Sequence, residues 1–330
     1  MGVMIMMGGM DMSYLDQLLD DALGDVGRLL CDETVREVMV NAPHDVWVER
    51  SGVMAPVSVS FSGQAGRTVV HTLLALSRRA SMMAGDPIMV DLAWRDWRLS
   101  AVLPPVAVRG PALCFRRHGS VVFPLQSFLG TQESELCRSI DGSERSPTRA
   151  TLPDWVMSAK NLLVSGGTGS GKTALLNSLI SFVPEEQRVV VIEDSRELQV
   201  QIPNHVIFEA NPVCQVTLRD LVRQALRFRP DRIIVGEVRG AEAFDLLQAM
   251  NTGHHGCLGT LHANNALDAV HRLAQLVLQA GMGWAEDAIA QQIVRTIHGI
   301  VHLTRVGGIR RIDHLQQLEG YDHGTYRWKT

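Results

Sequence analysis

The octapeptide Gly166–Thr173, GGTGSGKT, constrains this chain more than any other segment. It matches G-x-x-x-x-G-K-[ST] in full and follows a short apolar run at Asn161–Ser165. Its glycines let the backbone curl so that successive N–H groups point at phosphate oxygens, and a helix starting at Lys172 adds its positive end. Of the 330 residues only three are lysines (Lys160, Lys172, Lys329), and one stands where the motif requires lysine. The segment predicts a strand, a phosphate-binding loop and a helix in succession.

The residues of this loop have separate expected parts in binding ATP. The Lys172 ammonium can reach the β- and γ-phosphates, and the Thr173 hydroxyl can ligate Mg²⁺. The remaining expected nucleotide-binding residues are Gly166, Gly167, Thr168, Gly169, Ser170, Gly171 and Ala174. We therefore expect ATP and Mg²⁺ as ligands.

Two apolar runs downstream of the loop end in carboxylates. Val189–Asp194 ends in Glu193 and Asp194, and Arg232–Glu237 ends in Glu237. Carboxylates at the ends of parallel strands lie where such sheets bind ligands. One of Glu193 and Glu237 can orient the attacking water while the other serves the metal, and Glu237 is the candidate Mg²⁺ ligand beside Thr173. Sequence alone leaves both assignments of Glu193 and Glu237 open.

A third strand end carries His262, which can sense the γ-phosphate or couple the site to a neighbouring subunit. His254 and His255 precede it, but the three histidines do not make a convincing metal-ligand set. Arginines also recur about every fourth residue through a predicted helix, and they form either a solvated face or a basic lining. These arginines are Arg219, Arg223, Arg227 and Arg229.

The N-terminal third contains helical and strand patterns without the signature of a parallel sheet. Residues 13–117 are therefore predicted to form one α+β domain. Residues 1–12, which precede this domain, are predicted to be a flexible N-terminus. Its expected helices are 13–30 and 64–83. Its expected strands are 37–41, 46–50, 53–61, 87–90, 97–103 and 112–116.

The chain changes character after residue 117. Residues 118–157 are interrupted by glycine and proline and are predicted to be an interdomain linker, with a short helix around 125–138. From residue 158 to 330, strand and helix patterns alternate, which is typical of an α/β domain with a covered parallel sheet. The expected strands are 161–165, 188–193, 232–236 and 257–261. The expected helices are 172–182, 216–229, 241–250, 265–280 and 285–297.

Composition excludes several classes of protein. The chain is 46% hydrophobic and 20% charged, which excludes a disordered chain, and no apolar run is long enough to span a bilayer. Five scattered cysteines fit reduced thiols better than disulfides or a metal site. The net charge of −4 does not support direct nucleic-acid binding.

The motifs together resemble the secretion and pilus-assembly ATPases of the type II/type IV secretion superfamily, most of all its conjugal-transfer members of the TrbB type. The C-terminal segments that carry the resemblance are 166–173, 189–198, 229–240, 250–254, 259–265 and 318–326. Weaker matches are found in residues 35–50, 87–91 and 97–117.

This resemblance implies a RecA-like P-loop NTPase domain at the C-terminus, hexameric rings, and ATP held between the two domains. Glu193 then falls in an acidic box, Glu237 in a second acidic motif where glutamate replaces the usual aspartate, and His262 in a histidine box. Arg98 and Arg116 match N-terminal-domain arginines that approach the γ-phosphate.

Some positions depart from the family pattern. Ala174 replaces a usual threonine, His255 replaces an acidic or small residue, and residues 139–157 do not look like the amphipathic helix that usually precedes the loop. The absence of paired CxxC motifs separates this chain from the relatives that carry a zinc module.

We therefore expect a Mg²⁺-dependent ATPase that energises a type IV secretion or conjugal-transfer apparatus. It would form a homohexamer in the bacterial cytoplasm, peripheral to the inner membrane and bound to other apparatus subunits. The alternatives are a type IV pilus assembly or retraction motor, a RecA-like nucleic-acid translocase, and a nucleotide-binding scaffold without turnover.

Overall fold

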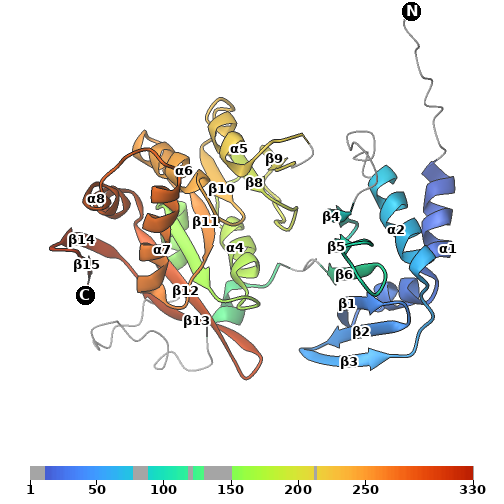
Figure 1. Cartoon of the computed structure of the whole chain (residues 1–330). Coiled ribbons are helices and arrows are strands. Elements are labelled where there is room, and N and C mark those ends of the chain that lie inside the picture. Colours follow the sequence, from blue (N-terminus) through green and yellow to red (C-terminus); the bar gives the residue numbers. More distant parts are fainter. Residues whose placement is uncertain (1–11, 77–87, 118–121, 130–150, 212–213, 330) are drawn as a thin grey trace, which may run out of the picture. The chain divides into compact units, whose positions relative to one another are not determined.

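The computed structural model describes residues 12–76, 88–117, 122–129, 151–211 and 214–329. The chain divides after His118 into two units, which are described separately below (Figure 1). Within the described residues, no helix combines the length and the apolar character needed to cross a membrane.

The N-terminal unit is a six-stranded antiparallel sheet with two helices. The strands lie in the order β3-β2-β1-β6-β5-β4, so that the first three form the predicted meander. The helices are α1 (Met12–Cys31) and α2 (Gly63–Leu76). The strands are β1 (Val35–Ala42), β2 (Asp45–Arg50), β3 (Val53–Val57), β4 (Met89–Trp94), β5 (Trp97–Val102) and β6 (Ala112–Arg117).

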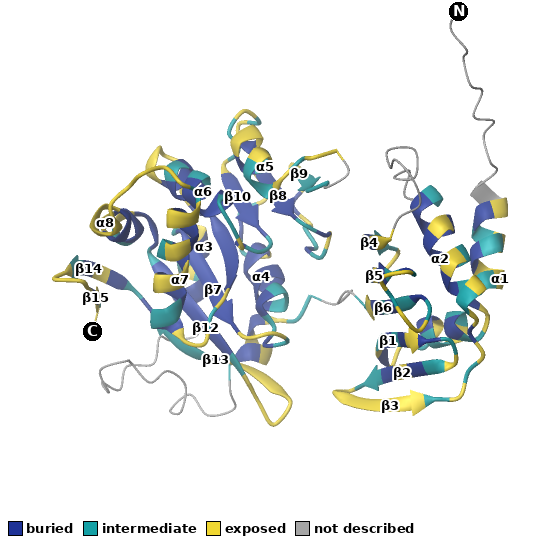
Figure 2. Ribbon diagram, viewed as in Figure 1, coloured by how far each residue is buried: buried dark blue, intermediate teal, exposed yellow. Residues whose placement is uncertain are grey.

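One face of this sheet forms the core of the unit. Leu19 and Leu23 of α1 and Val69 and Leu73 of α2 pack with alternate residues of the strands, such as Val38, because successive strand side chains point to opposite faces. The edge strand β3 remains largely exposed (Figure 2).

The C-terminal unit is built on a seven-stranded sheet in the order β13-β12-β7-β11-β10-β8-β9, parallel except for β13. Its first strands are β7 (Leu162–Gly166), β8 (Val189–Glu193), β9 (His205–Glu209), β10 (Arg232–Val235) and β11 (Leu258–His262). The hairpin β12 (Gly299–Val306) and β13 (Ile309–Gln316) follows, and β14 (Leu318–Asp322) with β15 (Thr325–Trp328) forms a separate two-stranded sheet.

Helices cover both faces of the large sheet (Figure 1). The helices are α3 (Thr151–Met157), α4 (Lys172–Ile180), α5 (Leu218–Ala225), α6 (Glu242–Asn251), α7 (Ala266–Gln279) and α8 (Glu286–Thr296), with a 3-10 turn η2 (Leu125–Phe128). Helices α3 and α4 and η2 share one hydrophobic cluster with the sheet, and helices α5 to α8 share another.

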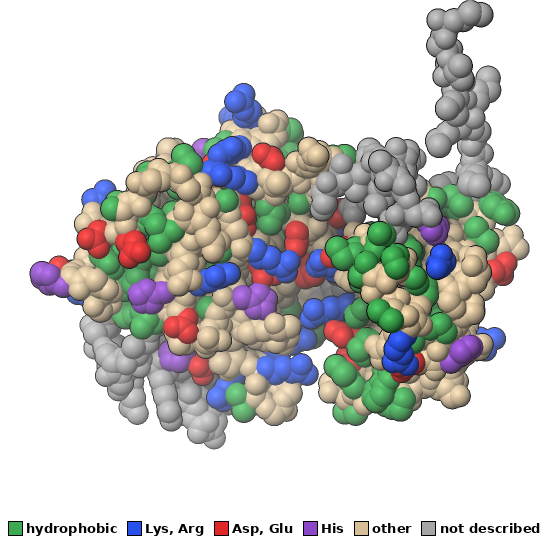
Figure 3. Space-filling view, in the orientation of Figure 1, with side chains coloured by type: hydrophobic (Ala, Val, Ile, Leu, Met, Phe, Trp, Pro, Cys, Tyr) green, Lys and Arg blue, Asp and Glu red, His purple; other side chains and the backbone are tan. Residues whose placement is uncertain are grey.

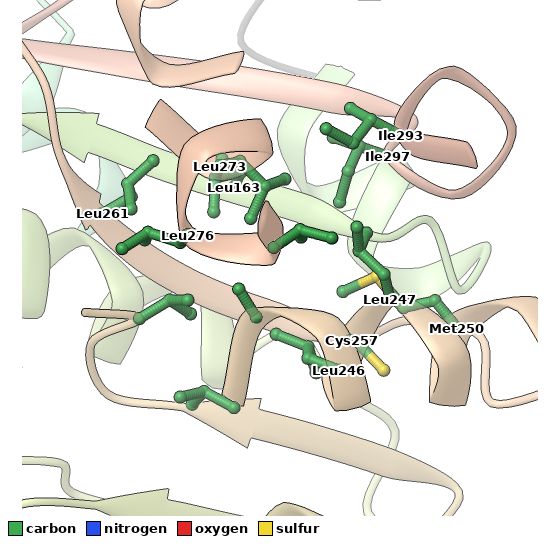
Figure 4. Packing of buried hydrophobic residues seen from close by; sticks show 14 of the residues in the cluster. Leu163, Leu246, Leu247, Met250, Cys257, Leu261, Leu273, Leu276, Ile293 and Ile297 are labelled. Carbon is green, nitrogen blue, oxygen red and sulfur yellow. The ribbon is translucent and has the colours of Figure 1, made fainter. Parts of the chain in front are cut away.

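Alternation along β7 connects the two clusters. Leu162 and Val164 pack with α4, whereas Leu163 points into the opposite cluster with Leu246 and Leu273 (Figure 4). A strand that is buried on both faces in this way explains the continuous apolar run before the phosphate loop.

The predicted fold class is confirmed: an α/β unit with a largely parallel sheet follows a smaller α+β unit. Strands β9 and β12 to β15 were not predicted. The prediction for 53–61 was too long, because β3 ends at Val57. Of the helix expected around 125–138, the described part is only the 3-10 turn η2.

The segment expected to be a linker also contains packed structure. Leu125 and Phe128 of η2 and Leu152 and Val156 of α3 are buried in the same cluster as α4. The intervening residues 130–150 and the flexible N-terminus predicted for residues 1–12 lie outside the described residues, except for Met12, which begins α1.

Candidate active site

The phosphate loop leaves β7 in a backbone conformation that requires glycine. Gly169 and Gly171 have φ angles of +71° and +100°, and Gly166 has +154°. A Cβ atom on Gly166 would lie 2.6 Å from both the Leu303 carbonyl oxygen and the Ser170 hydroxyl oxygen. The Ser170 hydroxyl is buried without a hydrogen-bond partner among the described residues. The loop is therefore closely packed against β12.

Lys172 lies at the first turn of α4 with 7% of its surface exposed. Its Nζ donates to the carbonyl oxygens of Gly166 and Gly167, at 3.1 and 2.9 Å. It also lies 3.4 and 3.3 Å from Nδ1 and Nε2 of His262. The ammonium group is thus held over the loop where phosphate oxygens would bind.

His262 connects Lys172 to the strand-end carboxylate of Glu237. Its Nε2 lies 3.2 Å from Glu237 Oε1. Burial, and next the charge of Lys172, lower the pKa of His262, which favours a neutral ring at pH 7. A neutral ring with its proton on Nε2 donates to Glu237 and accepts from Lys172 at Nδ1.

Arg239 joins the ends of β8 and β10. Its Nη1 donates to Asp194 Oδ2 and its Nη2 to Glu237 Oε2, both at 2.6 Å. Glu242 orients this turn, because its Oε1 accepts the backbone N–H groups of Arg239 and Gly240. The carboxylate of Glu237 therefore lies between a guanidinium and an imidazole.

Glu193 differs from Glu237 in its surroundings. It is 2% exposed, and its Oε1 accepts the backbone N–H groups of Glu197 and Leu198, both at 2.9 Å. Its Oε2 is buried and has no hydrogen-bond partner among the described residues. Burial raises the pKa of Glu193 to about 7, against the opposing effect of the two N–H donors.

Thr173 donates its hydroxyl to Oε2 of Glu197 at 3.2 Å. The loop held by Glu193 therefore places a further carboxylate beside the threonine expected to ligate Mg²⁺. Hydroxyl and carboxylate oxygens are the donors that Mg²⁺ prefers, so Thr173 with Glu197 fits this ion. Glu237, the other candidate ligand, is bonded to Arg239 and His262.

The structure thus brings together the phosphate loop, Lys172, Thr173, His262 and both acidic strand ends within the C-terminal unit. Sequence reasoning missed Glu197 and Arg239. Glu197 lies four residues after Glu193, and Arg239 lies two residues after Glu237. This short distance from a strand-end glutamate is the sequence signal by which both could have been found.

Arg98 and Arg116 lie in the N-terminal unit, directly opposite each other on β5 and β6. Arg98 makes a two-pronged ion pair with Asp91, with Nε–Oδ1 and Nη2–Oδ2 distances of 2.9 and 2.6 Å. Arg116 Nε lies 3.4 Å from Oε1 of Glu37. The two arginines therefore share one face of the sheet with carboxylate partners.

The basic helix predicted at 216–229 is partly neutralised. Arg219 and Arg223 of α5 both bind Asp245 of α6, at 2.6 and 2.8 Å. The spacing alone left open whether these two arginines form a solvated face or a basic lining. The structure shows instead that they form ion pairs between two helices.

Comparison with known proteins places these features in one family. The profile of the family described as type II/IV secretion system protein matches residues 20–309. The conjugal transfer protein TrbB of Rhizobium radiobacter is 32% identical, covering 94% of this chain and 92% of its own. The type IV secretion system protein VirB11 of Bartonella henselae is 26% identical, covering 87% and 89%.

Solved structures share the fold. The Legionella pneumophila ATPase DotB superimposes with a TM-score of 0.62 at 19% identity, covering 94% of this chain and 81% of its own. The pilus retraction motor PilT with bound ADP gives 0.58 at 18% identity, covering 89% and 81%. The expected RecA-like P-loop architecture is confirmed, and the chain belongs to the type II/IV secretion system protein family.

Proposed function

We propose that this protein is a Mg²⁺-dependent ATPase that energises a type IV secretion or conjugal-transfer apparatus. The observation that carries the proposal is the chain of contacts from Lys172 through His262 to Glu237, beside a complete phosphate loop. Together with relatives that act in conjugal transfer and type IV secretion, this favours nucleotide hydrolysis over a passive scaffold.

ATP would bind with its phosphates against the N–H groups of residues 166–173 and the N-terminal end of α4. Lys172 would exchange its carbonyl contacts for phosphate oxygens. Thr173 and Glu197 would hold Mg²⁺, which neutralises phosphate charge when bound. Because the pKa of His262 is lowered, its neutral ring adds no second positive charge beside Lys172.

In hydrolysis, Glu237 would orient a water molecule and accept its proton. The water oxygen forms a bond to the γ-phosphorus, and the bond from that phosphorus to the β–γ bridging oxygen breaks, giving ADP and phosphate. We assign this part to Glu237 because its carboxylate is linked through His262 to Lys172. Glu193, whose pKa of about 7 leaves about half of it protonated at neutral pH, would act as a positioning residue for the loop that carries Glu197.

The family resemblance assigns Arg98 and Arg116 to the γ-phosphate of a nucleotide. Each would have to exchange its carboxylate partner, Asp91 or Glu37, for phosphate oxygens. Arginine suits this exchange because it stays charged and binds either anion in a two-pronged manner.

We place the protein in the cytoplasm as a homohexameric ring at the inner-membrane surface, bound to other subunits of the apparatus. Closing and opening of subunits during ATP turnover would then drive transport. Direct nucleic-acid binding is not part of this proposal, because the chain has a net charge of −4.

Single-turnover ATP hydrolysis tests the proposal with Lys172→Ala, Glu237→Gln and the control Glu186→Gln, an exposed glutamate after α4. Loss of a general base lowers rates by about 10²–10⁴-fold, so we expect this loss for Glu237→Gln and no change for Glu186→Gln. Lys172→Ala should abolish hydrolysis. Equal rates for the wild type and Lys172→Ala would refute the enzyme assignment, and an unchanged rate for Glu237→Gln would refute that residue's role.

A further inference from the structure

The tip of the β12–β13 hairpin carries two arginines in a directly opposed pair. Arg305 and Arg310 are cross-strand partners, and Gly307 and Gly308 form the turn between them with φ angles of +58° and +84°. Like charges opposite each other on an antiparallel pair destabilise a sheet. An anion placed between the two guanidinium groups would be attracted by both of them.

The register determines which side of the sheet these arginines occupy. Leu303 of β12 and Ile312 of β13 are buried in the cluster that contains α4. Arg305 lies two residues after Leu303, and Arg310 lies two residues before Ile312, so both arginines share that face of the hairpin. Their face is therefore the one on which α4 begins.

The hairpin also extends past the point where β7 ends. Leu303 pairs with Gly166, the last residue of β7, so the following residues of β12 run beside the phosphate loop. Figure 3 shows arginine side chains, in blue, over this hairpin tip of the C-terminal unit.

Contacts with the loop glycines support this placement. A Cβ atom on Gly169 would lie 3.7 Å from Nη1 of Arg305. A Cβ atom on Gly171 would lie 2.7 Å from Cδ and 3.5 Å from Nε of Arg310. The aliphatic stem of Arg310 thus covers Gly171, and both guanidinium groups lie beside the backbone that binds phosphate.

We propose that Arg305 and Arg310 bind the α- and β-phosphates of the nucleotide as a second wall of the site. This inference rests on the proposed function of the phosphate loop. It adds two side chains from an element that the phosphate-binding motif does not include.

The strand order indicates why these arginines would contact the α- and β-phosphates rather than the γ-phosphate. Strand β7 lies between β11 and β12, and the Lys172, His262 and Glu237 chain, which serves the γ-phosphate, lies on the β11 side. The hairpin lies on the β12 side. Its arginines would therefore contact the α- and β-phosphates, which ADP and ATP have in common.

The test is calorimetric titration of Arg305→Ala and Arg310→Ala with Mg-ADP and with a non-hydrolysable Mg-ATP analogue. Loss of one charge-assisted contact should weaken binding by about tenfold, equally for both nucleotides. Arg311→Ala is the matched control. It removes the same charge from the neighbouring position, which pairs with Thr304 on the opposite face, and should leave both affinities unchanged.

A second measurement separates ligand binding from a structural role. Without nucleotide, Arg305→Ala should melt at the wild-type temperature or higher, because removing one of two opposed charges does not destabilise the hairpin. The rise in Tm caused by saturating Mg-ADP should be smaller than in the wild type.

Wild-type affinity for ADP in both arginine variants would overturn this inference, as would a loss confined to the ATP analogue. Either result would leave the proposed function intact if Lys172→Ala still lost nucleotide binding. Failure of the wild-type protein to bind either nucleotide would instead refute the proposed function and this inference together.

Discussion

At the scale of single residues, Glu193 and Glu237 show how one residue type is held in two different environments. Both stand at the end of an apolar strand, but Glu237 contacts Arg239 and His262, whereas the hydrogen bonds of Glu193 among the described residues come from backbone N–H groups. Burial raises the pKa of Glu193 to about 7 from an ordinary value of 4.5. The two glutamates differ in their surroundings because different turns follow strands β8 and β10.

This shift predicts a pH-dependent stability difference between the wild type and Glu193→Gln. Between about pH 4.5 and 7 the unfolded chain releases the Glu193 proton while the folded protein retains it, so wild-type stability falls as pH rises through this window. Glutamine keeps the acceptor oxygen but cannot ionise. We expect the free energy of unfolding of the variant, relative to the wild type, to rise by about 2–3 kcal/mol from pH 4.5 to 7.

Urea unfolding of the C-terminal unit at several pH values measures this difference. Glu186→Gln, which removes an exposed carboxylate by the same substitution, is the matched control. A Glu193→Gln curve parallel to the wild-type curve throughout the window would contradict the raised pKa.

At the scale of elements, helix α3 shows that part of the region predicted to be a linker, residues 118–157, belongs to the hydrophobic core. Leu152 and Val156 are 3% and 0% exposed and pack with α4, whereas Met157 on the same helix is 52% exposed. The Trp155 ring lies against Gly299 at the start of β12, where an added Cβ would be 2.3 Å from Cζ3. Helix α3 therefore supports the sheet where β12 and β7 begin, because Gly299 pairs with Leu162, the first residue of the strand that leads into the phosphate loop.

Removing the buried leucine of α3 should destabilise the C-terminal unit. We expect Leu152→Ala to lower its free energy of unfolding by about 2–5 kcal/mol, because the change leaves a cavity in the cluster. Met157→Ala, on the exposed face, should change it by less than about 0.5 kcal/mol. Denaturant unfolding followed by tryptophan fluorescence checks this, and equal stabilities for the two variants would show that α3 is not part of the core.

At the scale of the whole molecule, the chain consists of two units with separate cores. The phosphate loop and acidic strand ends belong to one unit, and Arg98 and Arg116 to the other. A ring in which nucleotide brings these groups together is the assembly implied by the family resemblance.

We predict that nucleotide promotes this assembly. Light scattering should give the mass of six chains of 36.3 kDa with Mg-ATP for Glu237→Gln, the variant expected to lose hydrolysis. Lys172→Ala, which removes the ammonium group proposed to bind phosphate, should require higher protein concentrations to reach the same mass. A mass of one chain for Glu237→Gln under saturating nucleotide would contradict the ring.

The sequence by itself determined the phosphate loop, the α/β and α+β halves, and the acidic and histidine strand ends. These features depend on local backbone chemistry and on the spacing of hydrophobic residues, and both can be recognised within a short segment of sequence. The tertiary structure alone decided that Glu197 meets Thr173, that Arg239 bridges two strand ends, and that the β12–β13 hairpin lies beside the loop. These contacts join residues between about 20 and 140 positions apart, and strand order, which no short pattern encodes, brings them together.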